Sequence, residues 1–389
     1  MKKCFKKLFA LMLVVVFGFC TFVLTGCGKE KTEIVIGMSG PLTGPAAVYG
    51  QAVLNSAKLA VDEINEAGGV NGYKLRLEGL DDKHDATLVS TNYASLLEKG
   101  MQVSIGCVTT KPCLEFCKLS AADGVFFITP SATGDAVVAE SNAYQMCFAD
   151  TRQGTFSARY VNDNISKDTK IGVLYRAGDE YSVGIYNKFK AELDPAFDLK
   201  EASFNEEAPT DMSSQVELLK DCKFIFLPIY YTPASIFMTQ AKDKVASDAV
   251  YFGCDGLDGI DSAIDGFDIN TIPQEVSYLS HFNSKATEGA AKTFIDKYVA
   301  KYGAGTLNQF GASAYDCVYA LANALKKIAE KNPDAVTPNA KPADLCKLLK
   351  EQFDGGFTFS GVTGSNVTWT KDGFVDKQAV KYVVKEKNN

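Results

Sequence analysis

The sequence predicts an α/β protein with two similar lobes, each a mainly parallel sheet flanked by helices. Short apolar runs rich in β-branched residues alternate with segments whose apolar residues recur at helical spacing. The same rhythm begins again after about residue 150, without a long low-complexity linker. The 389 residues are enough for two ordinary domains. This alternation favours parallel strands with helices on both faces of each sheet.

The first half begins with a compact apolar run at 34–38, which predicts a buried strand. A loop rich in Gly and Pro follows. A helix is then expected from residue 51 to Gly68, because Gly commonly ends helices. The remaining elements expected in this half are strands around 75–77, 103–106 and 125–128 and a helix at 86–99.

The second half predicts a second lobe of the same kind. Its expected strands are 171–175, 224–230 and 249–253, with helices between them, followed by helices at 287–302 and 308–330. The tail, 356–384, predicts short strands with a turn at 371–373. We therefore expect lobe 1 to comprise 33–150 and 281–375, and lobe 2 to comprise 151–280 and 376–389.

The N-terminal segment has the pattern of an export signal. A head with four lysines precedes an apolar run from Leu8 to Leu24, and Leu-Thr-Gly-Cys follows at 24–27. This ending is similar to a bacterial lipobox. It predicts a signal peptide at 1–26, a lipidated Cys27, a tether at 27–32 and a place on the outer face of the cell membrane. The alternative is a retained membrane span, for which the run is somewhat short.

Charge and cysteine content narrow the possible partners. The formal charge of −7 and the pI near 5.1 argue against nucleic acid, which needs a basic face. Eight cysteines follow Cys27, scattered and often inside apolar runs. We expect them to be mostly free, buried thiols, although their pairing cannot be deduced from spacing. They are Cys107, Cys113, Cys117, Cys147, Cys222, Cys254, Cys317 and Cys346.

The unusual residues gather in loops that follow the predicted strands. In open α/β sheets, ligands bind beyond the carboxyl ends of the strands. We expect six loops from the two lobes to converge on one cleft. These loops are 39–50, 107–112, 129–133, 179–181, 230–231 and 255–256.

Taken in order, the motifs in these loops resemble the branched-chain amino-acid-binding proteins of ABC importers, which have the type I periplasmic-binding fold. The resemblance covers essentially all of the chain after the signal segment. The motifs that carry it are Ile-Gly-Met-Ser-Gly-Pro-Leu-Thr-Gly (36–44), Tyr-Gly (49–50), Asp-Glu-Ile-Asn-Glu-Ala-Gly-Gly-Val-Asn-Gly (62–72), Asp-Asp (81–82), Ile-Thr-Pro-Ser-Ala-Thr (128–133), Asp-Glu-Tyr (179–181) and Gly-Cys-Asp-Gly (253–256).

The resemblance implies a binding site for an α-amino acid. The ligand carboxylate would meet Thr110, with Thr109 beside it, and the backbone N–H of Thr133. The ammonium would meet the Thr133 hydroxyl, the Ser131 carbonyl and Asp255. The ligand-binding set implied by the family is Tyr49, Thr109, Thr110, Ser131, Ala132, Thr133, Tyr181, Tyr230, Asp255 and Gly256. A zwitterion leaving water needs partners for both charges, which this set supplies.

The sequence departs from the family at one wall of the expected site. The best-known members carry a disulfide between two loops, whereas the corresponding positions here hold His84 and Thr109. The loop after the third strand also ends in Lys111 instead of continuing a run of serines. These differences leave the exact ligand open.

Other interpretations of the same residues are less specific. Residues 37–50 lack both phosphate-loop patterns, and only two histidines exist, so neither a nucleotide nor a metal site is expected. Cys113 and Cys117 fit core packing on one helix face. Asp255 alone could be an ordinary turn residue, and each tyrosine could be core or surface.

The predicted function is capture of a small solute outside the cell and its delivery to an ABC permease and ATPase complex, without a cofactor or metal. A branched-chain or other hydrophobic amino acid is favoured, and an aromatic one is open. The alternatives are a sensory receptor of the same fold, or a binder of another small carboxylate or amide. An exported enzyme is disfavoured, because no G-x-S-x-G elbow or metal-ligand motif is present.

Overall fold

The computed structural model describes residues 31–206, 209–261, 264 and 266–387. The chain divides into a short unit, Met1–Thr32, and a compact unit, Glu33–Asn389. The predicted signal segment, 1–26, and Cys27 lie outside the described residues. Within the described part of the chain, no helix is long and apolar enough to cross a membrane.

One sheet of the compact unit contains five parallel strands in the order β2-β1-β3-β4-β5. We call this sheet, the helices packed on it and α9, which packs on α2, lobe 1. Its strands are β1 (Glu33–Gly40), β2 (Lys74–Asp81), β3 (Val103–Ser104), β4 (Phe127–Thr129) and β5 (Ala143–Gln145). Its helices are α2 (Ala47–Glu66), α3 (Val89–Glu98), α4 (Thr110–Asp123), α9 (Gly289–Tyr302), α10 (Gln309–Lys331) and α11 (Pro342–Asp354).

The other sheet contains six strands in the order β11-β10-β9-β8-β6-β7, and we call it and its helices lobe 2. Only β11 runs antiparallel to its neighbour. The strands are β6 (Ile171–Arg176), β7 (Leu199–Phe204), β8 (Phe224–Leu227), β9 (Val250–Gly253), β10 (Glu275–Ser280) and β11 (Val380–Lys385). The helices are α5 (Asp150–Asn164), α6 (Glu180–Glu192), α7 (Ser213–Leu219) and α8 (Tyr231–Ala241).

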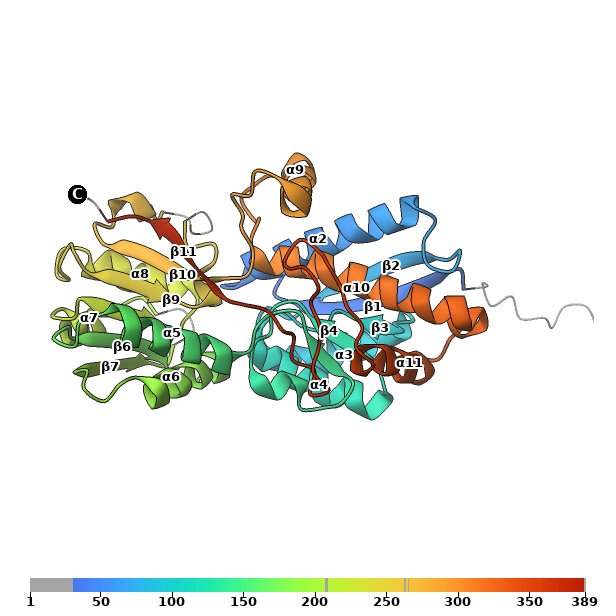
Figure 1. Cartoon of the computed structure of the whole chain (residues 1–389), viewed down its shortest axis with the longest axis horizontal. Helices are drawn as coiled ribbons and strands as arrows, with labels where there is room; N and C mark the ends of the chain where they lie inside the picture. The colour runs from blue at the N-terminus through green and yellow to red at the C-terminus, as the bar shows by residue number, and fades with distance from the viewer. Residues whose placement is uncertain (1–30, 207–208, 262–263, 265, 388–389) are drawn as a thin grey trace, which may run out of the picture. The chain divides into compact units, whose positions relative to one another are not determined.

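The chain passes between the two sheets after β5, after β10 and before β11 (Figure 1). Short 3₁₀ turns complete the connections, at Ala86–Leu88, Asp135–Val138, Asp255–Leu257, Ile269–Thr271 and Pro333–Ala335. This arrangement confirms the predicted two-lobed α/β fold. The exact lobe boundaries proposed from the sequence stay a prediction.

Strand β8 shows why these apolar runs form buried parallel strands. Successive side chains of a strand point to opposite faces, so a run of apolar residues can contact helices on both sides. Phe226 packs on Phe189 of α6, with ring centroids 4.4 Å apart. Its neighbour Ile225 belongs to the core that contains Phe237 of α8. Helices therefore cover both faces of the sheet.

The structure corrects several predicted element boundaries. The strand predicted at 224–230 ends at Leu227, and the helix predicted from residue 51 begins at Ala47. Strand β3, predicted at 103–106, ends at Ser104. Strand β4, predicted at 125–128, runs from Phe127 to Thr129. The tail forms isolated bridges at Phe359–Val367 and Trp369–Val375, with a regular strand only at β11.

Three strands were not predicted: β5, β7 and β10. Strand β5 has only three residues, too few to show a period. In β7, an edge strand, only Ala202 and Phe204 are buried, so its apolar signal is weak. Strand β10 carries Glu275, Ser277 and Ser280 among its apolar residues, which hides the run.

Candidate functional site

A small cavity lies where loops of the two lobes meet, with about 220 Å³ of empty space. It includes every residue of the predicted ligand-binding set except Ala132. The lining residues are Tyr49, Val108, Thr109, Thr110, Ser131, Thr133, Tyr181, Tyr230, Asp255, Gly256 and Phe310. Loops that follow strands of both parallel sheets thus converge, as expected for α/β folds.

Hydroxyl groups from two adjacent loops form the lobe 1 side of the cavity. Helix α4 begins at Thr110, so its first backbone N–H groups lie at the cavity. The Thr110 hydroxyl accepts a hydrogen bond from the Gly134 N–H at 3.2 Å, and the Ser131 hydroxyl donates to the Val108 carbonyl at 2.7 Å. These bonds fix the two loops against each other and leave hydroxyl and N–H donors facing the same space.

The lobe 2 side of the cavity contains a buried carboxylate with one free oxygen. The Tyr181 hydroxyl donates to Asp255 Oδ1 at 2.8 Å and accepts from the Gly256 N–H at 2.9 Å. Asp255 Oδ2 is buried and, within the described residues, has no hydrogen-bond partner. Burial raises the pKa of Asp255 to about 7. A buried acceptor without a partner costs free energy, so a hydrogen-bond donor on a ligand would stabilise this oxygen.

Direct contacts join the two sides across the cavity. The Tyr49 hydroxyl, from lobe 1, donates to the Gly256 carbonyl of lobe 2 at 2.5 Å. The Thr232 hydroxyl of lobe 2 donates to the Pro45 carbonyl of lobe 1 at 3.2 Å. The two lobes therefore touch over the cavity in this arrangement.

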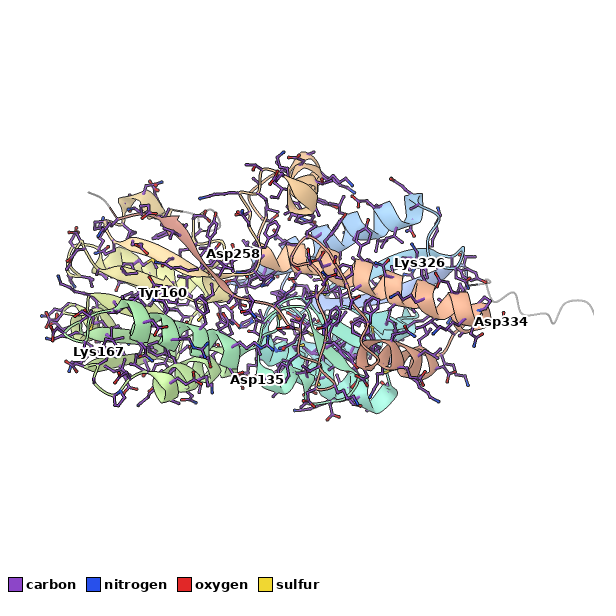
Figure 2. The ribbon with its side chains drawn as sticks, viewed as in Figure 1. Asp135, Tyr160, Lys167, Asp258, Lys326 and Asp334 are labelled. Carbon is purple, nitrogen blue, oxygen red and sulfur yellow. The ribbon has the colours of Figure 1, made fainter. Side chains whose placement is uncertain are left out.

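Asp258 adds a further link between the lobes. Its carboxylate accepts from the Tyr278 hydroxyl at 2.8 Å and from the backbone N–H of Gln309, at the start of α10, at 2.9 Å. Figure 2 labels Asp258 on the lobe 2 side of this junction. Burial raises the pKa of Asp258 to about 6. Because the helix N-terminus favours a negative charge, this contact ties α10 to lobe 2.

Aromatic rings enclose the rest of the cavity. Tyr230 stacks on Tyr181 with centroids 4.8 Å apart and an interplanar angle of 11°. Tyr49 meets Phe310 edge-on at 4.7 Å. Such rings exclude water and strengthen the polar interactions inside.

The two residues at the family's disulfide positions are also in contact. His84 Nδ1 lies 2.8 Å from Thr109 Oγ1, so a hydrogen bond joins the two loops. Burial and the nearby charges of Arg176 and Lys111 lower the pKa of His84 to about 4, which keeps the ring neutral. The eight cysteines after Cys27 are all free and buried in the described structure.

Sequence patterns did not reveal two residues that line this cavity, Val108 and Phe310, or a buried carboxyl group near Asp255, that of Asp150. Asp150, the first residue of α5, donates its backbone N–H to the Thr133 carbonyl at 2.8 Å, and its buried Oδ1 has no hydrogen-bond partner among the described residues. Burial raises its pKa well above the usual range, and the charge of Asp255 adds to this. An Asp at a helix start is common, so its sequence carried no distinct signal.

Ala132 lies beside the cavity without lining it. Its carbonyl accepts a hydrogen bond from Gln145 Nε2 at 2.9 Å, which holds the 130–134 loop on β5. Its role in binding stays a prediction. Within the described residues, no group of three or more His, Cys, Asp or Glu side chains is arranged to hold a metal ion.

Two parallel-sheet lobes that meet over a small polar cavity define the type I periplasmic-binding fold. The chain belongs to the periplasmic binding protein family, whose profile matches residues 33–388.

Two similar proteins have names that state which amino acids they bind. A Leu/Ile/Val-binding protein homolog 3 of Brucella melitensis is 30% identical over 231 residues, which cover 58% of this chain and 62% of that protein. The match thus spans less than two thirds of that relative. A leucine-, isoleucine-, valine-, threonine- and alanine-binding protein of Pseudomonas aeruginosa is 26% identical over 349 residues, covering 85% of this chain and 86% of that protein.

Among solved structures, the fold is similar to the branched-chain amino acid transporter substrate-binding protein LivJ from Streptococcus pneumoniae, in complex with isoleucine. The TM-score is 0.76 at 25% identity, and the match covers 91% of this chain and 99% of that one.

Proposed function

We propose that this chain is the extracytoplasmic solute-binding component of an ABC importer and that it holds an α-amino acid between its lobes. The observation that carries the proposal is the unpaired, buried Oδ2 of Asp255, opposite hydroxyl and N–H donors of lobe 1. A zwitterion would satisfy both sides at once, because its ammonium donates and its carboxylate accepts.

The carboxylate end of the ligand is assigned to lobe 1. Thr109, Thr110 and the Thr133 N–H would donate to it, beside the N-terminus of α4. A helix N-terminus favours an anion through its free N–H groups and dipole.

The ammonium end is assigned to the acidic side of the cavity. Asp255 Oδ2 and Asp150 Oδ1 would accept from it, with the Thr133 hydroxyl and the Ser131 carbonyl as further acceptors. Two buried carboxyl groups with free oxygens would offer acceptors to the ammonium, and its positive charge would favour their ionised form.

The side chain of the ligand would contact the aromatic and aliphatic wall, made by Tyr49, Val108, Tyr181, Tyr230 and Phe310. This wall suits a compact hydrophobic side chain, that of a branched-chain amino acid above all. The names of the Brucella and Pseudomonas relatives and the isoleucine in LivJ support the same class.

Capture would work by closure of the two lobes, because Tyr49 and Thr232 make contacts that exist only when the lobes meet. The closed form would then dock on the permease and ATPase complex. A lipidated Cys27 would hold the protein at the outer face of the membrane. A sensory receptor of the same fold is the alternative, and permease genes beside the coding sequence would favour transport.

A ligand without an amine is the second candidate, because the raised pKa of Asp255, about 7, lets the empty site hold a proton. A protonated Asp255 could donate to an acid or amide. We take the protein as a binding protein without catalytic residues or cofactor.

Titration calorimetry and thermal shift on the chain from Lys29 onward test the assignment, with amino acids, their amine-free α-keto or hydroxy analogues and amides. A ligand at about 100 times its Kd adds about 2.7 kcal/mol of stability. Binding of leucine, isoleucine or valine, with no binding of their amine-free analogues, is the expected result. Binding of the amine-free analogues alone would overturn the ammonium assignment.

A further inference from the structure

A groove separate from the amino-acid cavity lies between helix α5, helix α6 and the segment 376–379 that leads into β11. It encloses about 1,100 Å³ of empty space and opens to solvent. Among the described residues, none lines both this groove and the cavity at Asp255. Segment 376–379 belongs to one of the passages between the two sheets, so the groove lies beside a connection of the lobes (Figure 1).

One face of α5 forms the long wall of the groove. Arg152, Thr155, Phe156 and Arg159 all line it, because residues three or four positions apart lie on the same side of an α-helix. Arg152 and Arg159 are separated by two helical turns, which places their Cα atoms about 10 Å apart. Arginine side chains are long, so both guanidinium groups can reach one small ligand that lies between them.

Helix α6 forms the neighbouring wall and packs closely on α5 at Gly154. A Cβ atom on Gly154 would lie 2.7 Å from the Ile185 carbonyl oxygen and 2.7 Å from Lys188 Cβ. This close approach brings Lys188 to the groove, where it forms an ion pair with Glu192 at 2.6 Å. The pKa of Glu192 is lowered first by its hydrogen bond with Lys188 and only to a smaller extent by the charge of Arg159. Glu192 therefore balances the lysine more than the arginine.

The two arginines carry the positive charge that remains in the groove. Lys377 also lines it, but its side chain is buried and donates to the Thr363 hydroxyl. Arg152 Nη1 makes only long contacts, at 3.6 Å with Asp376 Oδ1 and at 3.5 Å with the Lys377 carbonyl. Arg159 is exposed and forms no ion pair within the described residues. In a chain with a formal charge of −7, this groove is a local positive site.

We propose that this groove binds a small oxyanion with two negative charges, such as phosphate, between Arg152 and Arg159. A guanidinium group donates two parallel hydrogen bonds to the oxygens of such an anion, and hydrogen bonds between charged partners are stronger than neutral ones. Two guanidinium groups match a dianion in charge. The anion replaces Asp376 as the partner of Arg152, because the Asp376 side chain is 69% exposed and its contact is long. This site does not depend on the proposed function.

Amide NMR titration of the full mature chain with inorganic phosphate, at constant ionic strength, tests the site. Wild type should bind one phosphate with a Kd of about 1 mM or lower. Arg152→Gln and Arg159→Gln should each weaken binding by about tenfold, because each removes a charged donor pair. Lys118→Gln is the matched control. It removes one positive charge from a side chain that is 73% exposed and lies outside the groove, so phosphate affinity should stay within about twofold.

A variant that removes the competing carboxylate tests the same site from the other direction. Asp376→Asn frees Arg152 and should tighten phosphate binding by about threefold. A melting temperature within a few degrees of wild type verifies the fold of each variant.

The position of the shifts decides between a site and a general attraction of anions. Saturable shifts confined to α5, the adjoining part of α6 and segment 376–379 would support the proposal. Equal affinity in wild type and both arginine variants, or shifts spread over surface lysines, would overturn it. So would the absence of saturable binding below about 10 mM phosphate. Leucine affinity in the same samples reports on the proposed function separately, because the two sites share no residue among those described.

Discussion

Two buried aspartates, Asp255 and Asp316, differ in what surrounds them. Asp316, in α10, uses both oxygens: Oδ1 accepts from the Val362 N–H at 2.8 Å, and Oδ2 accepts from the Thr363 N–H at 2.8 Å and from the Thr363 hydroxyl. Asp255 keeps one buried oxygen without a partner. Both carboxyl groups are buried and both have raised pKa values, so burial alone does not distinguish them.

A cation also stands beside Asp316, whereas the described part of the chain places none against Asp255. Lys377 is buried, donates to the Thr363 hydroxyl and acts on Asp316 through its charge. Burial lowers the pKa of this lysine to about 8. Lys377 lies just before β11, so the group ties α10 of lobe 1 to the segment that enters lobe 2. A satisfied buried carboxylate therefore stabilises the fold, whereas an unsatisfied one at a cavity is suited to bind a ligand.

The largest expected effect is on ligand binding. Asp255→Ala should weaken amino-acid binding by about 3–5 kcal/mol, or at least 100-fold, because the ligand ammonium loses its buried partner. The ligand-free protein should unfold at the same or a higher temperature, since the uncompensated carboxylate is gone. Calorimetry and thermal melting measure both. Unchanged affinity would show that the ammonium lies elsewhere.

Asp316→Asn should act on stability instead. Two or more hydrogen bonds to a charged acceptor are weakened, so the free energy of unfolding should fall by about 2–3 kcal/mol. Urea denaturation measures this loss. Under conditions where the variant is fully folded, its ligand affinity should stay within about threefold of wild type. Asp376→Asn is the control, because that side chain is 69% exposed and its loss should cost less than about 0.5 kcal/mol. Equal losses in the two variants would contradict the structural role.

The pH dependence separates the zwitterion from an amine-free ligand. The pKa of Asp255 is raised to about 7, so below pH 7 the carboxyl group holds a proton that an ammonium must displace. Amino-acid affinity should fall by up to about tenfold per pH unit below pH 7, and Asp255→Asn should flatten this profile. An amine-free acid should show the opposite slope in calorimetry.

The titration of Asp255 should also make the stability of the ligand-free protein depend on pH. The folded state holds the Asp255 proton more tightly than the unfolded chain, whose carboxyl has its usual pKa. The free energy of unfolding should therefore decrease as pH rises from about 4 to about 7. Asp255→Asn should remove this part of the slope, and an unchanged slope in urea titrations would assign it to other groups.

The smallest expected effect on affinity comes from a hydrogen bond that joins the two lobes. Tyr49→Phe removes the hydrogen bond from the Tyr49 hydroxyl to the Gly256 carbonyl and should weaken binding by about 1 kcal/mol, roughly fivefold. The aromatic contact with Phe310 remains, so the cavity wall is kept. Calorimetry measures the change. A loss as large as that of Asp255→Ala would mean that the ring itself is displaced.

Part of the fold was predictable because it depends on local patterns. Strands such as β1 and β8 are continuous apolar runs, and α10 carries an apolar stripe along its length, so their period is visible in the chain. Edge strand β7, and β10 with polar residues between its apolar ones, were missed, because their pairing with neighbouring strands leaves no distinct pattern in their own sequence. The motif residues of the site were predictable through their family resemblance.

By itself, the sequence determined the alternation of strands and helices and the loops that carry Thr133, Tyr181 and Asp255. Only the tertiary structure decided which side chains meet. It placed Asp150 and Phe310 beside loops from which they are distant in the chain, left Asp255 Oδ2 unpaired, and paired His84 with Thr109. The physical reason is that hydrogen-bond satisfaction and cavity shape depend on contacts between distant segments, which no local period records.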